Sequence, residues 1–465
     1  MKIYNTLSRK IEEFRPINDK EVNVYICGLT VYDYMHIGHA RTYMAFDAIL
    51  RYLDYRGYKV NYVQNVTDVD DKIIKRAKEA GRDPKELSAE FHEKSMGDQE
   101  ALGLLMPDEF PKVTGNIAGI IDAVESLIKK GFAYEVKGSV YFDVSKAGGY
   151  GRLSNQDEKQ LKKHRIEPNP NKKNPLDFAL WKSVDAHEYG FDSPWGYGRP
   201  GWHIECSVLS RKFLGDQLDI HGGATDLIFP HHENEIAQSE ALTGKKPFIK
   251  YWMHTGFLQS SGEKMSKSLG NILPVREFLK EFSADAFRLF VLQAHYRSPI
   301  DYSTDNIKDA EKTLERLKEF RRRLQSAVHG NGTKAKEAAD VLKARFVGSM
   351  DNDFNTPKAL SELFDFVRGV NSLMDAESES TVSLEYALEA FDEIVGVLGL
   401  HIEDTAELSS EDAELIEQRE QYRREKNWAK SDEIRVQLAE KGLRLIDNKD
   451  GSTRVIKESN LQNGR

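Results

Sequence analysis

Apolar and polar residues follow two different patterns along this chain of 465 residues, and the pattern changes near residue 300. Upstream of that point, β-rich runs such as VNVYIC, KVNYVQNVTD, QLDIHGG and FIKYWMHTGF are separated by stretches with helical spacing. One of these stretches, ARTYMAFDAILRYLDYRG, ends in a glycine that stops the helix. Alternating strands and helices predict an α/β fold built on a mostly parallel sheet.

The α/β pattern is interrupted once and is followed by two further regions. Between residues 111 and 199, GSVYFDVSKAGGYGRLSNQ and RIEPNPNKKNPLDF indicate an insertion with small strands. From residue 305 to 400 the apolar spacing is helical almost throughout, as in TPKALSELFDFVRGVNSLM, which predicts a helical bundle. The polar stretch HIEDTAELSSED then separates this bundle from a last, smaller unit.

Composition narrows the class of protein. A formal net charge of -9 with 30% charged residues is typical of a soluble protein. The N-terminal segment MKIYNTLSRKIEEF lacks the apolar region of a signal peptide, and two cysteines cannot make a disulfide framework. We therefore expect a cytoplasmic protein with no membrane partner. Its two thiols, Cys27 and Cys206, should be reduced, which leaves them as core fillers, a catalytic nucleophile or metal ligands.

The charge is unevenly distributed in the C-terminal half. Residues 308–345 carry 11 Lys/Arg against 6 acids, and residues 419–457 carry 11 against 7. The segment 349–417 between them holds 18 acids and only two basic residues. Such runs are usually solvated helix faces, and a surface that binds a polyanion is the alternative.

The first chemical signal is HIGH, residues 36–39, which follows the first predicted strand and opens the first helix. Backbone N–H groups and the helix dipole favour an anion at that position. Gly38 allows a flat ring to approach the backbone, and two imidazoles could stabilise charge that develops on a phosphate. Two unrelated surface or core histidines are the alternative.

The second signal is EKMSKSLGN, residues 263–271, in a loop rich in Gly and Ser after the last predicted strand. Lys264 and Lys267 could reach a pyrophosphate leaving group if the loop closes. A pair of lysines in a loop is usually exposed to solvent and has no specific function. The order of the two motifs, on a helix N-terminus and then on a loop, favours the functional interpretation.

Together these residues resemble the class I aminoacyl-tRNA synthetases, and within that class the cysteine-specific synthetases. The stretches that carry the resemblance are, in order along the chain, CGLTVYDYMHIGHAR, NVTDVDDKIIKRA, GRPGWHIECS, DIHGG, FPHHENEIAQS and KMSKS. The resemblance implies a Rossmann-type, doubly wound parallel sheet. The implied parts are a catalytic domain split into residues 1–110 and 200–250, a connective-peptide insertion at 111–199, a KMSKS loop and stem-contact region at 251–304, a helical bundle at 305–403, and a small C-terminal anticodon-recognition domain at 404–465.

A metal site is predicted from spacing together with the resemblance. In FPHHENEIAQSEAL, Pro230 suits the first turn of a helix, so His231 and Glu235 would stand four residues apart on one face. Zinc accepts thiolate, imidazole and carboxylate, which makes Cys27, Cys206, His231 and Glu235 a sensible set of four ligands. Spacing alone leaves two unrelated core thiols equally open, because there is no CxxC. The resemblance favours one Zn²⁺ per chain, which would distinguish the thiolate of cysteine from the hydroxyl of serine.

The resemblance also implies a two-step reaction with three partners, namely ATP, L-cysteine and tRNA(Cys). The cysteine carboxylate would attack the α-phosphate of ATP, and the terminal ribose of the tRNA would then take the cysteinyl group. Mg²⁺ is expected with ATP, and the chain is expected to be a monomer. The implied catalytic residues are His36, His39, Lys264 and Lys267; Gly38, His221, Gly222 and Gly223 would complete the ATP site, and Thr67 and Trp202 would line the cysteine pocket.

In the last unit, the stretch QYRREKNWAKSDEIR offers residues for reading an anticodon. Trp428 could stack on an unpaired base while Arg423 and Asp432 bond to base edges, as the resemblance implies. The alternative is that Trp428 packs in the core of a small domain. Three rival functions stay open: a ligase that joins cysteine to a small amine, a non-catalytic RNA-binding relative, and a plain nucleotidyltransferase with an HxGH motif.

Overall fold

The computed structural model describes residues 1–156, 169–260, 263–264, 272–326, 330–402, 410–424, 427–441, 443–447 and 453–457. The chain forms two compact units. The large unit contains Met1–Leu314 and Ala327–Leu400, and the small unit contains Glu315–Ser326 and His401–Arg465. Among the described residues, no helix combines the length and apolar composition that crossing a bilayer requires.

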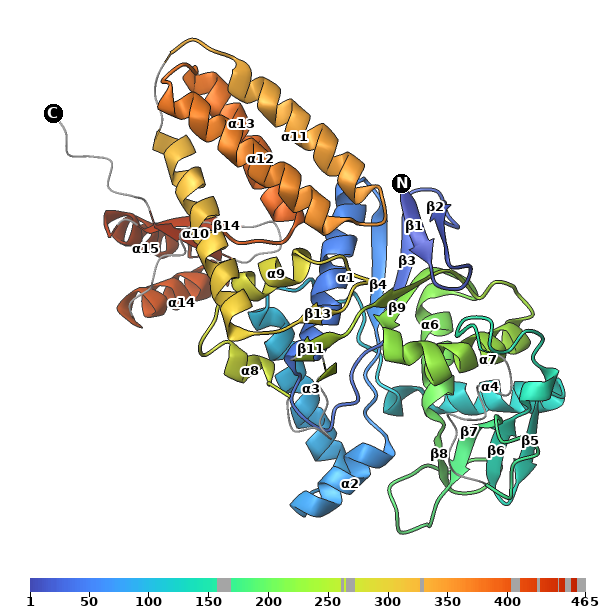
Figure 1. The fold of residues 1–465 in the computed structure, drawn as a ribbon. Coiled ribbons are helices and arrows are strands. Elements are labelled where there is room, and N and C mark those ends of the chain that lie inside the picture. Colours follow the sequence, from blue (N-terminus) through green and yellow to red (C-terminus); the bar gives the residue numbers. More distant parts are fainter. Residues whose placement is uncertain are drawn as a thin grey trace. The chain divides into compact units, whose positions relative to one another are not determined.

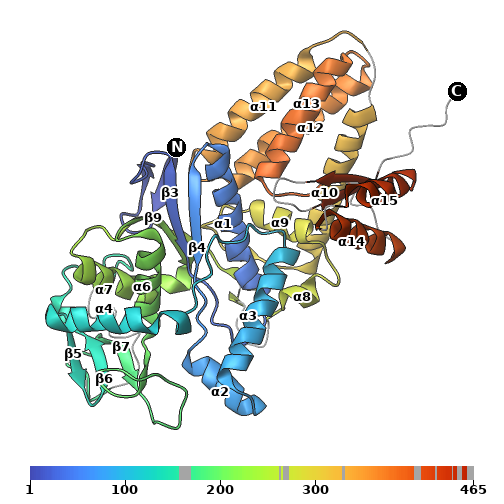
Figure 2. The same ribbon diagram turned by 180° about the vertical axis from the view of Figure 1, so that it is seen from behind.

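A four-stranded parallel sheet lies at the centre of the large unit, in the order β10-β9-β3-β4. Its strands are β3 (Glu21–Ile26), β4 (Lys59–Gln64), β9 (Leu218–Ala224) and β10 (Ile249–Thr255). Helix α1 (Ile37–Tyr55) covers one face, and α6 (Trp202–Leu214) with α7 (Glu233–Thr243) covers the other (Figures 1 and 2). Burial of both faces explains the nearly continuous apolar runs in these strands. The predicted doubly wound sheet is confirmed.

The helices between the strands of the sheet begin and end at residues that cap them. Asp70 caps α2 (Asp71–Ala80), and Gly81 ends it with a φ of 63°, a left-handed conformation that glycine adopts without strain. Asp83 caps α3 (Pro84–Ala101) through the N–H groups of Lys85 and Glu86. Two shorter elements, α8 (Val275–Phe278) and α9 (Ala284–Leu292), follow the sheet later in the chain.

The predicted insertion forms a four-stranded antiparallel sheet next to helix α4 (Ile117–Lys129). Its strands, in the order β5-β6-β7-β8, are β5 (Ala133–Val136), β6 (Ser139–Phe142), β7 (Phe178–Ser183) and β8 (Gly198–Pro200). Two smaller sheets complete the strands of the large unit. They contain β1 (Lys2–Asn5) with β2 (Lys10–Glu13), and β12 (Glu263–Lys264), β11 (Leu258–Ser260) and β13 (Ile300–Asp301).

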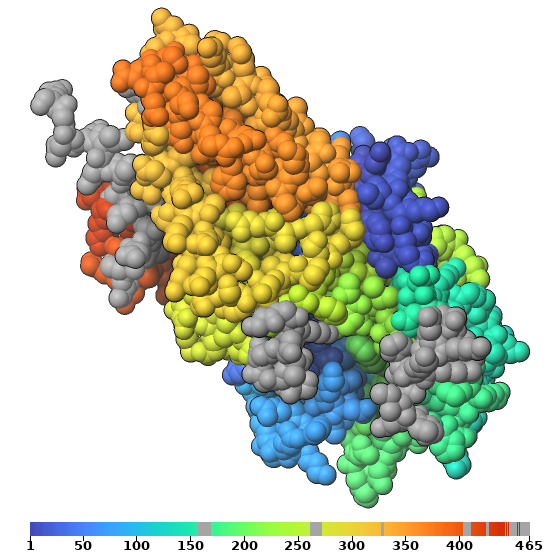
Figure 3. Space-filling model, in the orientation of Figure 1, coloured from blue at the N-terminus to red at the C-terminus, as the bar shows by residue number. Residues whose placement is uncertain are grey.

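The helical region after residue 300 is also as predicted. Helix α10 (Thr304–Ser326) leads to α11 (Lys334–Met350), which packs against both α12 (Thr356–Asp375) and α13 (Thr381–Val397). The last three helices form one continuous surface, drawn in orange in the space-filling view (Figure 3). Their fully buried contacts include Phe346, Leu363, Val370, Phe391 and Ile394.

The small unit has its own apolar core. It contains α14 (Ser410–Arg424), α15 (Trp428–Glu440) and the antiparallel pair β14 (Leu443–Asp447) and β15 (Thr453–Lys457). Ile434 and Leu438 on α15 pack with Leu443 and Leu445 on β14. This core forms without Trp428, whose side chain is 58% exposed.

A buried charge cluster holds α1 against the rest of the large unit. The carboxylate of Asp47, 2% exposed, accepts hydrogen bonds from Arg51 Nε at 2.8 Å, from the Leu105 N–H at 2.6 Å and from Arg288 of α9. Burial alone would raise the pKa of Asp47, but the two guanidinium groups outweigh it and hold the pKa below its ordinary value. The cluster fixes the helix that carries HIGH.

We predict that Asp47→Asn destabilises the large unit by about 3 kcal/mol or more, because Arg288 would stay buried with an unpaired charge. Since the folded-state pKa of Asp47 is depressed, its stabilisation is fully present above the unfolded-state pKa of ~3.9 and is lost as the pH falls through the folded-state value. Urea unfolding of the unsubstituted chain and of Asp47→Asn should therefore show a constant difference in the free energy of unfolding near neutral pH. That difference should become smaller in acid.

The matched control is Asp54→Asn, on the same helix but exposed. It should change the free energy of unfolding, measured in urea, by no more than ~0.5 kcal/mol. Equal effects of the two substitutions would contradict the role assigned to the cluster.

Candidate metal centre and nucleotide pocket

A cavity of about 390 Å³ opens at the carboxyl ends of the central strands. Ligands bind at this edge in doubly wound sheets, because the loops there leave a crevice. The walls come from the segments after β3, β9 and β10 and from the N-terminus of α1. Among the predicted site residues, the cavity is lined by Cys27, His36, Gly38, His39, Trp202 and Gly223.

The HIGH segment lies at the N-terminus of α1, as predicted, but His36 has a structural task as well. Its Nδ1 accepts hydrogen bonds from the N–H groups of Gly38 at 3.1 Å and His39 at 3.3 Å, which caps the helix. The Nδ1 of His39 in turn lies 3.5 Å from the His36 N–H, and the two rings stack with centroids 3.6 Å apart. Each Nδ1 therefore faces the backbone, and the proton of each neutral ring belongs on Nε2.

The segment that follows the second motif lies next to the first motif. The chain that leaves the EKMSKSLGN loop pairs with the HIGH segment: the Ile37 N–H donates to the Leu273 carbonyl at 3.0 Å, and the Val275 N–H donates to the Met35 carbonyl at 2.9 Å. Lys264 ends the short strand β12, and its side chain lies outside the described residues, as does the whole of Lys267.

The four predicted metal ligands come together. The ligand atoms of Cys27, Cys206, His231 and Glu235 all lie within 4.8 Å of one another, and all four residues are buried. Both cysteines are free thiols. Glu235 is 0% exposed, and neither of its carboxylate oxygens has a hydrogen-bond partner among the described residues. One carboxylate oxygen lies 3.0 Å from His231 Nε2 as an ion pair, and two thiols, an imidazole and a carboxylate are donors that suit a zinc-like ion.

Two glycines allow the ligands to converge from distant segments. A Cβ on Gly28, next to Cys27, would lie 1.6 Å from the Asn65 carbonyl oxygen, and a Cβ on Gly201 would lie 1.8 Å from that of Ala179. Only glycine permits these approaches, and Gly201 is the N-cap of α6, which carries Cys206.

One local prediction is wrong by a turn. Pro230 does not open the helix that carries Glu235. It lies in an irregular, π-type segment, Ile228–His232, and α7 begins at Glu233. His231 and Glu235 nevertheless meet, because the segment brings His231 back toward the first turn of α7.

Burial and mutual charge set the protonation of the four groups. Burial raises the pKa of the Cys27 thiol, and the hydrogen bond with Cys27 together with burial raises that of Cys206 well above its ordinary value. Burial also raises the pKa of Glu235, while it opposes protonation of His231. The charges of Glu235 and Cys206 outweigh that effect and raise the pKa of His231 to about 10. Burial thus disfavours the charged forms of both thiols and of Glu235, while the nearby negative charge favours the imidazolium of His231.

The structure adds histidines that the sequence did not single out. His232 Nε2 lies 3.2 Å from Cys27 Sγ, and His232 Nδ1 lies 2.8 Å from His254 Nε2. On the other side of the cluster, His203 Nδ1 lies 2.9 Å from His231 Nδ1. Two signals could have found them, namely the doubled histidine in FPHH and the histidine at the end of the predicted strand FIKYWMHTGF.

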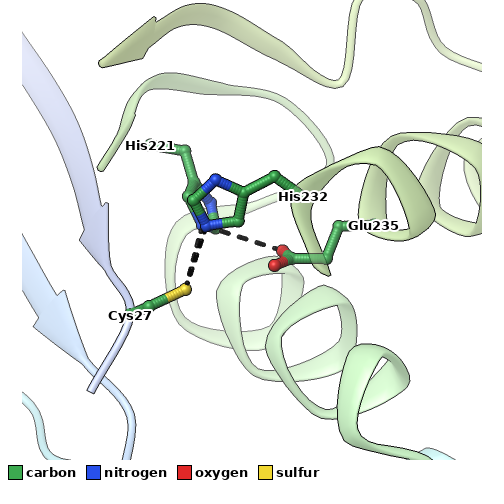
Figure 4. A group of neighbouring side chains, drawn as sticks. All are labelled: Cys27, His221, His232 and Glu235. Atoms are coloured by element: carbon green, nitrogen blue, oxygen red, sulfur yellow. Dashed lines mark hydrogen bonds and ion pairs between the residues drawn. The ribbon is translucent and has the colours of Figure 1, made fainter. Parts of the chain in front are cut away.

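His221, which we expected beside adenosine, lies instead with the cysteine and glutamate ligands (Figure 4). It is fully buried, with Nε2 3.5 Å from Cys27 Sγ and 3.8 Å from Glu235 Oε2. Gly222 is likewise covered, since a Cβ there would lie 2.2 Å from the Phe46 ring. Of the three residues, Gly223 alone lines the cavity.

Of the two candidates for the amino-acid pocket, one lines the cavity and the other is buried behind it. Trp202 lines the cavity and stacks on His231, with ring centroids 4.2 Å apart. Thr67 is 1% exposed and donates a hydrogen bond to Glu205 at 3.2 Å, so it lies behind the wall of the pocket.

In the small unit, Trp428 and Asp432 stand one turn apart on α15, and both are exposed. Arg423, on α14, donates hydrogen bonds to Glu420 at 3.3 Å and to Thr453 at 3.0 Å. The guanidinium is therefore held by its neighbours, whereas the indole presents an open face.

Family models match most of the chain. Residues 13–312 match the tRNA synthetases class I (C) catalytic domain, and residues 345–403 match the DALR domain. The second match begins in the last turns of α11 and covers α12 and α13.

Solved structures of low sequence identity share the fold. A methionyl-tRNA synthetase of Mycobacterium tuberculosis in complex with methionyl-adenylate aligns with a TM-score of 0.62 at 18% identity, over 81% of this chain and 90% of that one. A leucyl enzyme of Agrobacterium radiobacter, in a ternary complex titled LeuRS-tRNA-LeuAMS, aligns with a TM-score of 0.60 at 11% identity, over 83% and 85%.

Curated relatives match over nearly the full length. The cysteine--tRNA ligase of Thermococcus onnurineus is 47% identical over 97% of this chain and 98% of its own. That of Thermodesulfovibrio yellowstonii is 45% identical over 98% and 100%. The chain therefore belongs to the cysteine--tRNA ligase family of class I aminoacyl-tRNA synthetases.

Proposed function

We propose that the chain activates L-cysteine with ATP to cysteinyl-adenylate and transfers the cysteinyl group to the 3′ end of tRNA(Cys). The observation that carries this proposal is the buried Cys27, Cys206, His231 and Glu235 cluster beside the cavity that HIGH lines. Cys27 of this ligand set and the N-terminus of α1 line the same cavity, which suits a substrate with a sulfur at one end and an adenylate at the other.

The two HIGH histidines would act on the α-phosphate through their Nε2 atoms. Because each Nδ1 accepts from the backbone, each neutral ring carries its proton on Nε2, from which it can donate to a phosphate oxygen. Two such donors at the N-terminus of α1 would stabilise the negative charge that develops when the cysteine carboxylate attacks. Lys264 and Lys267 would hold the departing pyrophosphate, and Mg²⁺ would accompany ATP.

The cluster fits zinc by its chemistry. Two thiols, an imidazole and a carboxylate are ligands that zinc accepts, and the buried carboxylate of Glu235 needs a positive charge. When bound there, zinc would take the substrate sulfur as a thiolate, which serine cannot supply at neutral pH. Trp202, stacked on His231, would form the wall that keeps the amino acid against the ligands.

For tRNA, we propose that the helices from α10 onward and the small unit follow the acceptor and anticodon arms. The small unit would read the anticodon through the exposed indole of Trp428, with Arg423 and Asp432 at base edges. Its core forms without Trp428, which supports recognition rather than packing as the role of this residue. The chain would act as a monomer in the cytoplasm.

The proposed function is tested by ATP–pyrophosphate exchange with cysteine, with serine and without amino acid, followed by charging of tRNA(Cys). We expect exchange with cysteine only and transfer to the tRNA. Exchange without transfer would instead indicate a ligase that joins cysteine to a small amine.

We predict that Cys206→Ser lowers both the zinc content and the kcat/KM for cysteine in the exchange assay, by ~100-fold or more for the latter, because one thiolate ligand is lost. The affinity for ATP should change little, since HIGH lies on a separate element. Metal analysis and exchange kinetics on the same preparations measure both effects.

The control for this variant is Ser210→Ala, one turn further along α6, where the buried hydroxyl donates to the Ser207 carbonyl of the same helix. It should keep its zinc and its activity. A Cys206→Ser protein with full zinc and unchanged cysteine kinetics would refute the assigned ligand set.

We further predict that Trp428→Ala raises the KM for tRNA(Cys) by ~10-fold, through lost stacking worth about 1–3 kcal/mol, and leaves pyrophosphate exchange intact. Val436→Ala on the same helix, also 58% exposed, is the matched control and should change neither assay. If Trp428→Ala damages both assays equally, the residue is structural and the anticodon assignment loses its support.

A further inference from the structure

Cys27 and Glu235 are shared by two sets of potential metal ligands. Besides the set with Cys206 and His231, the ligand atoms of Cys27, His221, His232 and Glu235 also lie within 4.8 Å of one another, and all are buried (Figure 4). The proposed zinc site uses the first set and leaves both histidines of the second without a task. We call the two sets the first and the second position.

The separations in the second position suit a tetrahedral ion. Cys27 Sγ lies 3.2 Å from His232 Nε2 and 3.5 Å from His221 Nε2, and Glu235 Oε2 lies 3.8 Å from His221 Nε2. With Zn–S near 2.3 Å and Zn–N or Zn–O near 2.1 Å, tetrahedral angles place ligand atoms about 3.4–3.6 Å apart. The side chains therefore need only small shifts to accept an ion.

The carboxylate of Glu235 divides its two oxygens between the positions. Oε1 faces His231 of the first position at 3.0 Å, and Oε2 faces His221 of the second at 3.8 Å. Neither oxygen has a hydrogen-bond partner among the described residues. A carboxylate arranged in this way can bridge two ions, and Cys27 Sγ, common to both sets, can do the same.

A series of hydrogen bonds orients one ligand of the second position, His232. His232 Nδ1 lies 2.8 Å from His254 Nε2, and His254 Nδ1 lies 2.9 Å from the Thr6 hydroxyl. This series engages the far nitrogen of His232, so its Nε2 points at Cys27. Partners of this kind, which fix the ring of a ligating histidine, accompany protein metal sites.

We propose that Cys27, His221, His232 and Glu235 form a second divalent-metal position, so that the chain can hold two ions bridged by Cys27 and Glu235. Thiolate and imidazole ligands select zinc-like ions over Mg²⁺ or Ca²⁺. The proposal rests on the proposed function for its first position, with which it shares two ligands.

Charge sets the order of filling. An ion of charge +2 in the first position meets two thiolates and one carboxylate, which leaves a net charge of −1 in a buried site. A second ion gains attraction from that charge but adds only two neutral imidazoles as new ligands, and the pair carries +1. The second ion should therefore bind more weakly than the first, and a chain purified at low metal should carry about one.

The test is a titration of the metal-free chain with Co²⁺, which replaces zinc and reports its ligands by absorption. We expect two equivalents in two steps, the first with strong sulfur charge-transfer absorption. Electron paramagnetic resonance of the doubly loaded chain should show a weakened signal, because a thiolate bridge couples the two ions.

Variants assign the steps. His232→Asn and His221→Asn should each abolish the weaker step and keep the first, whereas Cys206→Ser should weaken the first and keep one bound ion. The exposed His187→Asn is the matched control and should retain both steps.

The outcomes are separate from those of the proposed function. A wild-type chain that saturates at one equivalent and still activates cysteine overturns the second position alone. Two equivalents that persist in both His232→Asn and His221→Asn also overturn it, since the second ion would then lie elsewhere. A chain that binds no metal and still rejects serine overturns the metal site as a whole.

Discussion

A buried carboxylate without a hydrogen-bond partner, Glu235, is the constraint on which the site depends. A charge at zero exposure costs several kcal/mol unless a cation or a proton meets it. In the chain by itself the proton on His231 serves, because Glu235 and Cys206 raise the pKa of that imidazole to about 10. A metal ion would serve better, since it would satisfy the two thiols at the same time. The fold thus keeps a place for positive charge at the end of its central sheet.

The fold makes this convergence possible because parallel strands end at one edge. Cys27 follows β3, His221 lies in β9, and the segment before α7 supplies His231 and His232, so ligands distant in sequence meet at the crevice of the sheet. Gly28 and Gly201 remove side chains where the backbone must approach a carbonyl oxygen closely. On the opposite face of the sheet, the Asp47 cluster holds the helix that begins with His36. The cysteine, histidine and glutamate cluster and the HIGH segment are therefore positioned by different contacts.

Much of this could be predicted from the sequence, and the remainder fails for identifiable reasons. Periodicity was sufficient for the strands and helices, and spacing with family resemblance was sufficient to predict that the four residues of the first position come together. The positions of His221 and Pro230 needed coordinates: a histidine within a strand can face a cavity or the core, and the irregular segment before α7 depends on packing rather than propensity. No local sequence pattern shows whether Trp428 is buried or exposed, and in the structure it is exposed.

The division between the two ends of the cavity explains why a second metal position is compatible with the proposed reaction. The HIGH histidines direct Nδ1 to the backbone at the N-terminus of α1, and in the proposed reaction their Nε2 atoms would act on phosphate rather than on a metal ion. His221 and His232, by contrast, direct Nε2 at Cys27 from the buried side of the cluster, away from the cavity that they do not line. An ion held there would leave the wall formed by Trp202 and Gly223 in place. It would act on the substrate only through the charge of the bridging thiolate and carboxylate, and so would adjust the affinity of the first ion for sulfur rather than take part in phosphate chemistry.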